Sequence, residues 1–215
     1  MKKYWHKITV QHLEAIQTKT REFISKTKDR YNSTFHIFKW QEFTDAVPEI
    51  LTAFDHLDMK VIMVSAYFMK NNTHGSPHKD STVIPIRVNI PILNTANTWT
   101  TFWEPKPEYV DQGGIMLPNG LKYYPYNRDD LVEQTRCEIT DATLIRPMEI
   151  HSVEFAEDNP TPRITLTLSL DPLPYNYFPD IENQISIQDL TSKEWGEESS
   201  HKREFFRSMV RPGYL

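Results

Sequence analysis

The sequence is short of glycine and cysteine, and it lacks both a long apolar run and a basic cluster. Six glycines stand against 15 prolines in 215 residues, which favours many short elements joined by turns over a bundle of long helices. The one cysteine, Cys137, excludes an internal disulfide and a zinc site built on paired cysteines. No run of about 20 apolar residues is available to span a membrane, and the first residues lack the apolar stretch of a secretion signal. We therefore expect a cytoplasmic protein without a membrane partner.

The remaining composition is that of a globular chain. Because the net charge is −5 and lysine and arginine are not concentrated anywhere, nucleic acid is not an expected partner. Hydrophobic residues make up 39% of the chain and charged residues 25%, which excludes wholesale disorder. A length of 215 residues supports one sizeable core, so we expect a single domain over residues 1–215. The oligomeric state stays open.

Apolar residues recur at helical spacing in two segments near the start of the chain, residues 10–28 and 44–57. In the second segment, Thr44 or Asp45 would cap the helix and Pro48 would lie in its first turn. Further along, the apolar pattern changes to that of β-strands. The predicted strands cover residues 60–70, 82–93, 98–104, 135–140, 142–147, 150–156 and 163–170.

Helices thus precede the strands, and no helix is predicted between one strand and the next. This order is typical of a mainly β protein whose antiparallel strands form a sandwich or barrel, with N-terminal α-helices packed outside. We divide the chain into a helical part over about residues 1–58, a barrel core over about 60–170 and a C-terminal extension over about 171–215, which contains a predicted helix over 200–210. The turn-rich stretch 104–131 would suit a substrate lid, although ordinary packing explains its aromatic residues as well.

A histidine and a carboxylate, His78 and Asp80, lie two residues apart beside a strand-like segment. Side chains at positions i and i+2 of an extended chain point to the same side, so one metal ion can bind both. His151, which lies in the predicted strand 150–156, is the best third ligand. Two histidines and one carboxylate on one face of an octahedron are typical of non-haem Fe(II) oxygenase sites. Taken alone, His78 and Asp80 fit a solvated polar turn equally well.

Other histidines compete for this role. His56 and Asp58 repeat the spacing, but they fall at the end of a predicted helix, where a histidine suits the negative end of the helix dipole. His74 and His78 lie four residues apart, which is a zinc-binding spacing on helices, but the intervening Pro77 argues against a helix there. We therefore expect neither His56 nor His74 to be a ligand.

The predicted strand 163–170 places Arg163 and Thr165 on one face, together with further hydroxyl side chains, and leucine and isoleucine on the other. An arginine that points into a small barrel is costly unless it meets an anion, and a cosubstrate carboxylate would supply one. The alternative is a surface arginine that pairs with Glu154 on a neighbouring strand.

Together these residues resemble a known pattern. His78-Lys79-Asp80, His151, and Arg163 followed by Thr165 are similar to the H-x-D…H…R-x-S/T pattern of the 2-oxoglutarate- and Fe(II)-dependent oxygenases. The stretch RVNIPIL, residues 87–93, resembles the aspartyl/asparaginyl β-hydroxylase-like branch, in which an arginine and a histidine two residues apart help to hold 2-oxoglutarate. Arg87 matches that arginine, whereas Asn89 stands where the branch has histidine. The resemblance covers about residues 60–170.

The resemblance implies a double-stranded β-helix, a jelly-roll or cupin-like barrel. It implies that Fe(II) is held by His78, Asp80 and His151, and that 2-oxoglutarate is the cosubstrate. Arg163 would then pair with the distal carboxylate of 2-oxoglutarate, and Thr165 would add a hydrogen bond. Asn89 would donate a hydrogen bond to the iron-chelating end, and Arg87 would steady that end or the substrate. Tyr67, at the end of the strand before the ligands, would reach the cosubstrate or fill the core.

The activity implied is a dioxygenase that uses O2 to hydroxylate an unidentified substrate, either a small molecule or a side chain of a polypeptide. Two alternatives remain open at this point. One is a cupin-type metal enzyme that does not use 2-oxoglutarate, which would leave Arg163 unexplained. The other is a non-catalytic barrel that serves as a binding module.

Overall fold

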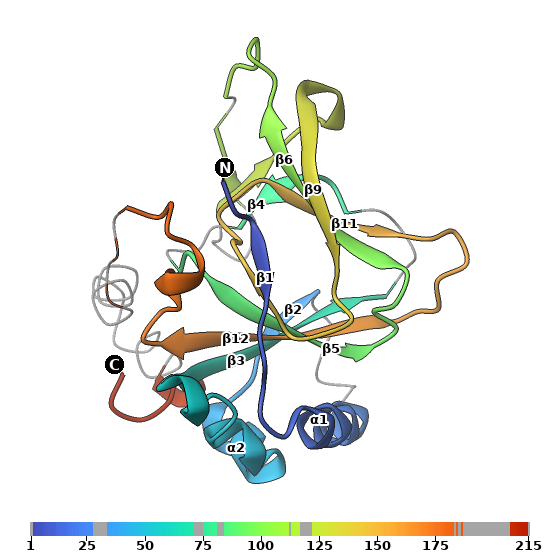
Figure 1. The fold of residues 1–215 in the computed structure, drawn as a ribbon. Helices are drawn as coiled ribbons and strands as arrows, with labels where there is room; N and C mark the ends of the chain where they lie inside the picture. Colours follow the sequence, from blue (N-terminus) through green and yellow to red (C-terminus); the bar gives the residue numbers. More distant parts are fainter. Residues whose placement is uncertain are drawn as a thin grey trace.

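The computed structural model describes residues 2–27, 34–70, 75–80, 84–111, 113–116, 122–182, 184, 186 and 207–214. In this part of the chain the protein is mainly β, and its strands pair antiparallel in two six-stranded sheets (Figure 1), which we call sheet A and sheet B. None of the helices described has the length and apolar character that crossing a membrane requires.

Each sheet takes strands from distant parts of the sequence. Sheet A contains, in spatial order, β1 (Trp5–Lys7), β10 (Thr143–Ile145), β5 (Arg87–Leu93), β12 (Arg163–Asp171), β3 (Lys60–Met69) and β2 (Phe35–Ile37). Sheet B contains β7 (Ile115–Met116), β8 (Lys122–Pro125), β4 (His78–Lys79), β11 (His151–Phe155), β6 (Thr98–Pro105) and β9 (Leu131–Glu138). From β3 to β6, and again from β9 to β12, successive strands alternate between the two sheets.

The helices cover the outer face of sheet A (Figure 1). The helix α1 (Leu13–Thr27) confirms the helix predicted over residues 10–28, and it buries Ile16 and Ile24. The shorter helix α2 (Trp40–Ala46) buries Phe43. These side chains belong to one core cluster with the apolar residues of β3, β5 and β12, so the main hydrophobic core lies between the helices and sheet A.

The second predicted helix, over residues 44–57, is wrong in extent. Only its first residues belong to α2, and Pro48–Leu51 and Asp55–Leu57 form separate 3-10 helices. The reason is Pro48, because a proline disfavours the helical conformation in the residue before it. Val47 accordingly has a φ of −131° and a ψ of 65°, outside the helical region.

Sheet A has one apolar face and one polar face, and both are buried. On β12, Leu166 and Leu168 belong to the core cluster under the helices. The alternate residues Arg163, Thr165 and Thr167 point to the opposite face of the strand, and they are buried as well. Arg163 donates a hydrogen bond to Thr98 on β6, so the polar face of sheet A is turned toward sheet B. The polar face of sheet A therefore lines part of the space between the two sheets, beside a small apolar cluster that includes Phe102 of β6 and Ile145 of β10.

The predicted strands correspond to β3, β5, β6, β9, β10, β11 and β12, although β5 begins at Arg87 and β9 begins at Leu131. Five strands of two to four residues were not predicted, namely β1, β2, β4, β7 and β8, because such short segments show no periodicity. The helix predicted over residues 200–210 lies mostly outside the described residues. In the part of it that the structure describes, Arg207–Met209 are helical.

The stretch 104–131, for which a substrate lid and ordinary packing both stayed open, is partly built into sheet B. Its strand β8 pairs with β4, where Tyr124 lies opposite Lys79. Tyr109 packs on Tyr126 with ring centroids 5.6 Å apart. Residues 112 and 117–121 of the stretch lie outside the described residues. The described aromatic residues therefore fit the packing interpretation.

Candidate metal centre

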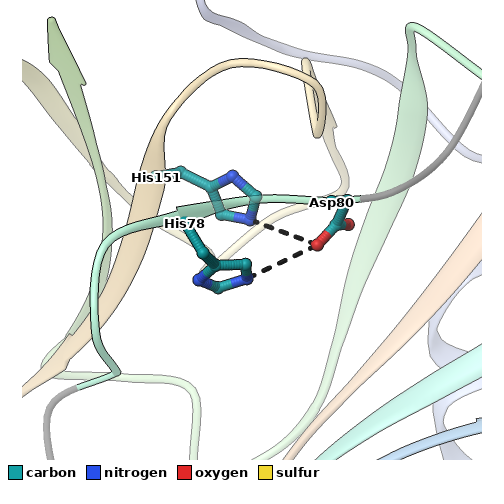
Figure 2. Close-up of side chains that lie close together, drawn as sticks. All are labelled: His78, Asp80 and His151. Carbon is teal, nitrogen blue, oxygen red and sulfur yellow. Dashed lines mark ion pairs between the residues drawn. The ribbon is translucent and has the colours of Figure 1, made fainter. Parts of the chain in front are cut away.

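The sheet topology brings His78, Asp80 and His151 together. His78 and His151 are directly paired across the β4–β11 ladder, and Asp80 follows β4. One ligand atom from each of the three side chains lies within 4.8 Å of the others. Figure 2 shows the two imidazole rings turned toward the same carboxylate oxygen. In the part of the chain that the structure describes, no other three such side chains gather in this way.

The two histidines present the nitrogen that a metal needs. The Nδ1 atom of His78 lies 2.8 Å from the carbonyl oxygen of Ser76, and Nδ1 of His151 lies 2.9 Å from that of Glu149. Because a carbonyl oxygen only accepts hydrogen bonds, each Nδ1 carries the proton. In the neutral rings the lone pair is then on Nε2, the tautomer that a backbone acceptor fixes in metal sites. The Nε2 atoms of His78 and His151 lie 3.4 and 4.0 Å from Oδ1 of Asp80.

Asp80 is held from two further directions. Its backbone N–H donates to the carbonyl oxygen of Pro147 at 3.0 Å, in the loop that leads to His151. Its Oδ2 atom accepts a hydrogen bond of 3.1 Å from the hydroxyl of Tyr67 on β3. Tyr67, for which we expected a contact with the cosubstrate or the core, thus contacts the carboxylate of the candidate metal site.

The protonation states of the three side chains favour the binding of a cation. Burial alone would raise the pKa of Asp80, but the hydrogen bond with His78 and the charges of His151 and Arg87 lower it to about 2. Burial also works against protonation of His78, yet Asp80 outweighs it and raises the pKa of that ring. The pKa of His151 is lowered, first by burial and then by the charge of His78. At neutral pH the site therefore contains an ionised carboxylate and an uncharged His151.

Arg163 is a buried cation without an acidic partner among the described residues. Its side chain is 2% exposed, and its Nε–H donates to the hydroxyl of Thr98 at 2.9 Å. Burial lowers the pKa of Arg163 to about 10. Glu154, the alternative partner, pairs instead with Arg128 at 2.8 Å. The surface interpretation of Arg163 is therefore wrong.

Thr165 provides a second buried polar group on the same strand face as Arg163. It lies directly opposite Tyr67 in the β12–β3 ladder, so the two side chains share the inner face of sheet A. Within the described residues its buried Oγ1 has no hydrogen-bond partner. A buried hydroxyl without a partner costs about 1–3 kcal/mol. A bound carboxylate that accepts from Arg163 and Thr165 would remove this cost, so these residues fit an anionic ligand.

Arg87 and Asn89 also lie on the inner face of sheet A. Arg87 is 8% exposed, and its charge acts on both Asp80 and Tyr67. Asn89 is paired with Thr167, whose hydroxyl donates to the Asn89 Oδ1 atom at 2.8 Å. Because Oδ1 is the acceptor of this amide, its Nδ2 group is the one left to donate to a ligand.

The competing histidines lie elsewhere. His56 and Asp58 are exposed around the 3-10 helix Asp55–Leu57, and His74 lies outside the described residues. Sequence reasoning missed Thr98, which holds Arg163. The alternation in the predicted strand 98–104 could have placed Thr98 on one face, but only the packed sheets show that this face meets Arg163.

Comparison with known proteins gives weak similarities. No protein-family model matches the chain, and the search of curated proteins finds no significant match. Among solved structures, the non-haem α-ketoglutarate-dependent epimerase SnoN from nogalamycin biosynthesis is 12% identical over 79% of this chain and 78% of SnoN, with a TM-score of 0.46. HygX from Streptomyces hygroscopicus, with iron bound, is 8% identical over 79% and 82%, with a TM-score of 0.42. An L-ribose isomerase from Cellulomonas parahominis is 13% identical over 78% and 88%, with a TM-score of 0.34. Such values do not distinguish between these activities, so the functional assignment rests on the side chains of this chain.

Proposed function

We propose that this protein is a 2-oxoglutarate- and Fe(II)-dependent oxygenase that hydroxylates a substrate. One observation carries the proposal: the guanidinium group of Arg163 is buried between the sheets without an acidic partner among the described residues. It lies on the same inner face as Thr165 and Tyr67, and Tyr67 contacts Asp80. A buried cation on the same inner face as a residue that contacts the metal site is suited to a small anion that also binds the metal.

The strand order supports a double-stranded β-helix. The eight strands from β3 to β6 and from β9 to β12 alternate between sheet A and sheet B. A chain that winds between two antiparallel sheets in this way builds a jelly-roll or cupin-like barrel. In this barrel the helices occupy the outside of sheet A, which leaves the inner faces for the site.

The metal ligands would be His78, Asp80 and His151. Their two Nε2 atoms and one carboxylate oxygen converge from neighbouring segments (Figure 2). Such a set would hold Fe(II) through three protein ligands and would leave it able to bind further ligands. When bound, Fe(II) and 2-oxoglutarate supply the oxidising chemistry, in which O2 is consumed and 2-oxoglutarate is converted to succinate and CO2.

The polar inner face of sheet A would bind and orient 2-oxoglutarate. Arg163 would donate to the distal carboxylate, and the Thr165 hydroxyl would add a hydrogen bond to the same group. Arg87, whose charge reaches Asp80, and the Nδ2 group of Asn89 would steady the end near the metal. Phe102, directly paired with His151 and fully buried, would help to exclude water.

Arg87 and Asn89 are also the residues that support an aspartyl/asparaginyl β-hydroxylase-like branch within this function. Both are buried on one face of β5, two residues apart. Asparagine in place of histidine keeps a hydrogen-bond donor but removes a titratable ring. The substrate within this proposal is a small molecule or a side chain of a polypeptide.

Anaerobic titration of the Fe(II)-loaded protein with 2-oxoglutarate tests the proposal. A 2-oxo acid chelated to Fe(II) gives a visible absorption band, and we expect this band to rise to saturation. Protein that binds Fe(II) without developing the band would be a metal enzyme that does not use 2-oxoglutarate. Protein that binds neither would be a binding module. Mass spectrometry of proposed substrates after aerobic turnover would then identify the substrate.

A further inference from the structure

We infer that Tyr67 is a positioning residue for the metal site. By donating a hydrogen bond to Oδ2 of Asp80, its hydroxyl holds the carboxylate so that Asp80 binds the metal through Oδ1 alone. The inference rests on the metal site of the proposed function, but it does not depend on 2-oxoglutarate.

The two oxygen atoms of Asp80 face different groups. Oδ1 faces the Nε2 atoms of His78 and His151 at 3.4 and 4.0 Å (Figure 2). Oδ2 faces Tyr67, whose hydroxyl donates to it at 3.1 Å. A carboxylate that is free to rotate can bind a metal through one or both oxygens. A phenol that donates to Oδ2 restrains the rotation of the carboxylate and occupies one lone pair of that atom, which favours metal binding through Oδ1 over binding through both oxygens.

Tyr67 is itself well fixed. It lies within the ten-residue strand β3, opposite Thr165 on one side and Phe35 on the other. Its ring packs on that of Phe35 with centroids 4.8 Å apart. Asp80, by contrast, follows β4, a strand of two residues. The hydrogen bond therefore joins a ligand that directly follows a short strand of sheet B to a long strand of sheet A.

Removal of the hydroxyl should weaken the metal site without removing a ligand. Substitution of a residue that orients a metal ligand typically lowers metal affinity by roughly 10–100-fold. In the Tyr67→Phe variant, Asp80 would be free to turn and bind through both oxygens. We expect a lower metal affinity, because the carboxylate is no longer held in place before the metal binds. Binding through both oxygens would also change the coordination geometry, although all three ligands are present.

The test measures Co(II) binding in the absence of 2-oxoglutarate, because Co(II) stands in for Fe(II) and its visible spectrum reports coordination number. The matched control is Tyr214→Phe, which removes a hydrogen bond of the same kind, from the Tyr214 hydroxyl to Oδ2 of Asp171 at 2.9 Å. We expect Tyr67→Phe to bind Co(II) about 10–100-fold more weakly, with an altered spectrum, and Tyr214→Phe to bind like the unmodified protein.

Two results would overturn the inference. One is a folded Tyr67→Phe protein whose Co(II) affinity and spectrum are unchanged. The other is an equal loss of affinity in Tyr214→Phe, which would indicate a general effect on stability. If Tyr67→Phe weakened only the binding of 2-oxoglutarate, Tyr67 would be a cosubstrate residue instead. If the Co(II) result held while no 2-oxoglutarate bound, the positioning role would stand and the proposed oxygenase function would fail.

Discussion

Arg163 on sheet A and Thr98 on sheet B are joined by a hydrogen bond of 2.9 Å from Nε to Oγ1. This bond turns the guanidinium group into the space between the sheets, where it is 2% exposed. One neutral hydroxyl does not compensate the burial of a full positive charge. The arginine is therefore costly in the free protein, and an anionic ligand would offset that cost.

Replacement of Arg163 by methionine should separate ligand binding from stability. We expect 2-oxoglutarate to bind at least about tenfold more weakly, because the carboxylate loses a charged donor in a buried site. The free energy of unfolding should not fall, because the variant no longer buries an uncompensated charge. Calorimetric titration and denaturant unfolding measure the two effects. Unchanged affinity would contradict the role of Arg163.

Thr165 and Leu166 are neighbours in sequence but should respond in opposite ways. Thr165→Ala removes a hydroxyl without a partner among the described residues, which relieves the cost of burying that hydroxyl and should not lower the free energy of unfolding. The same substitution should weaken 2-oxoglutarate binding about tenfold. Leu166→Ala opens a cavity in the core cluster and should cost about 2–5 kcal/mol, with ligand affinity unchanged. Equal effects of both substitutions on ligand affinity would show that the inner face is not the binding face.

Alanine at His78, Asp80 or His151 should abolish tight Fe(II) binding while the protein stays folded. The expected loss exceeds the roughly 100-fold limit that is usual for residues that only orient ligands. His56→Ala is the control, because His56 is exposed and lies outside the three-residue group. Metal analysis after dialysis gives the measurement, with circular dichroism to check the fold. Loss of metal in His56→Ala alone would overturn the assignment.

The affinity for metal should fall as the pH is lowered, in two steps. A proton on an imidazole must leave before that ring binds a metal. The pKa of His78 is raised above its ordinary value of 6.5, so its proton begins to compete above pH 6.5, and affinity should drop about tenfold per pH unit. The pKa of His151 is lowered, so the slope should steepen only below pH 6.5. Co(II) titrations at several pH values would show this, whereas a flat profile would contradict it.

Asn89→Ala should raise the KM for 2-oxoglutarate and increase turnover that is not coupled to substrate oxidation. The reason is the loss of the Nδ2 donor, which Thr167 orients by bonding to Oδ1. Thr167→Val leaves the amide in place but frees its orientation, so a smaller effect in the same direction is expected. Succinate formation is measured against product formation. If Asn89→Ala left both parameters unchanged, Asn89 would have no part in cosubstrate binding.

The sequence predicted the parts of this site more fully than their arrangement. The two-residue spacing of His78 and Asp80 and the alternation along β12 are local properties, because successive side chains of an extended chain point to opposite sides. The position of His151 beside His78 is not local. It depends on β4, whose two residues are too few to show a strand pattern and form a strand only by pairing with β8 and β11.

By itself, the sequence determined the strand periodicity, the helix over residues 10–28 and the separation of β12 into a polar and an apolar face. Only the tertiary structure decided which face packs against the helices and which face is turned toward sheet B. The helices cover the leucine face of β12, so the face with Arg163 and Thr165 is enclosed between the sheets, although a polar face usually meets water. It also placed the Tyr67 hydroxyl on Asp80. The physical reason is that periodicity follows from backbone geometry, whereas the partner of each face is selected by contacts between residues far apart in sequence.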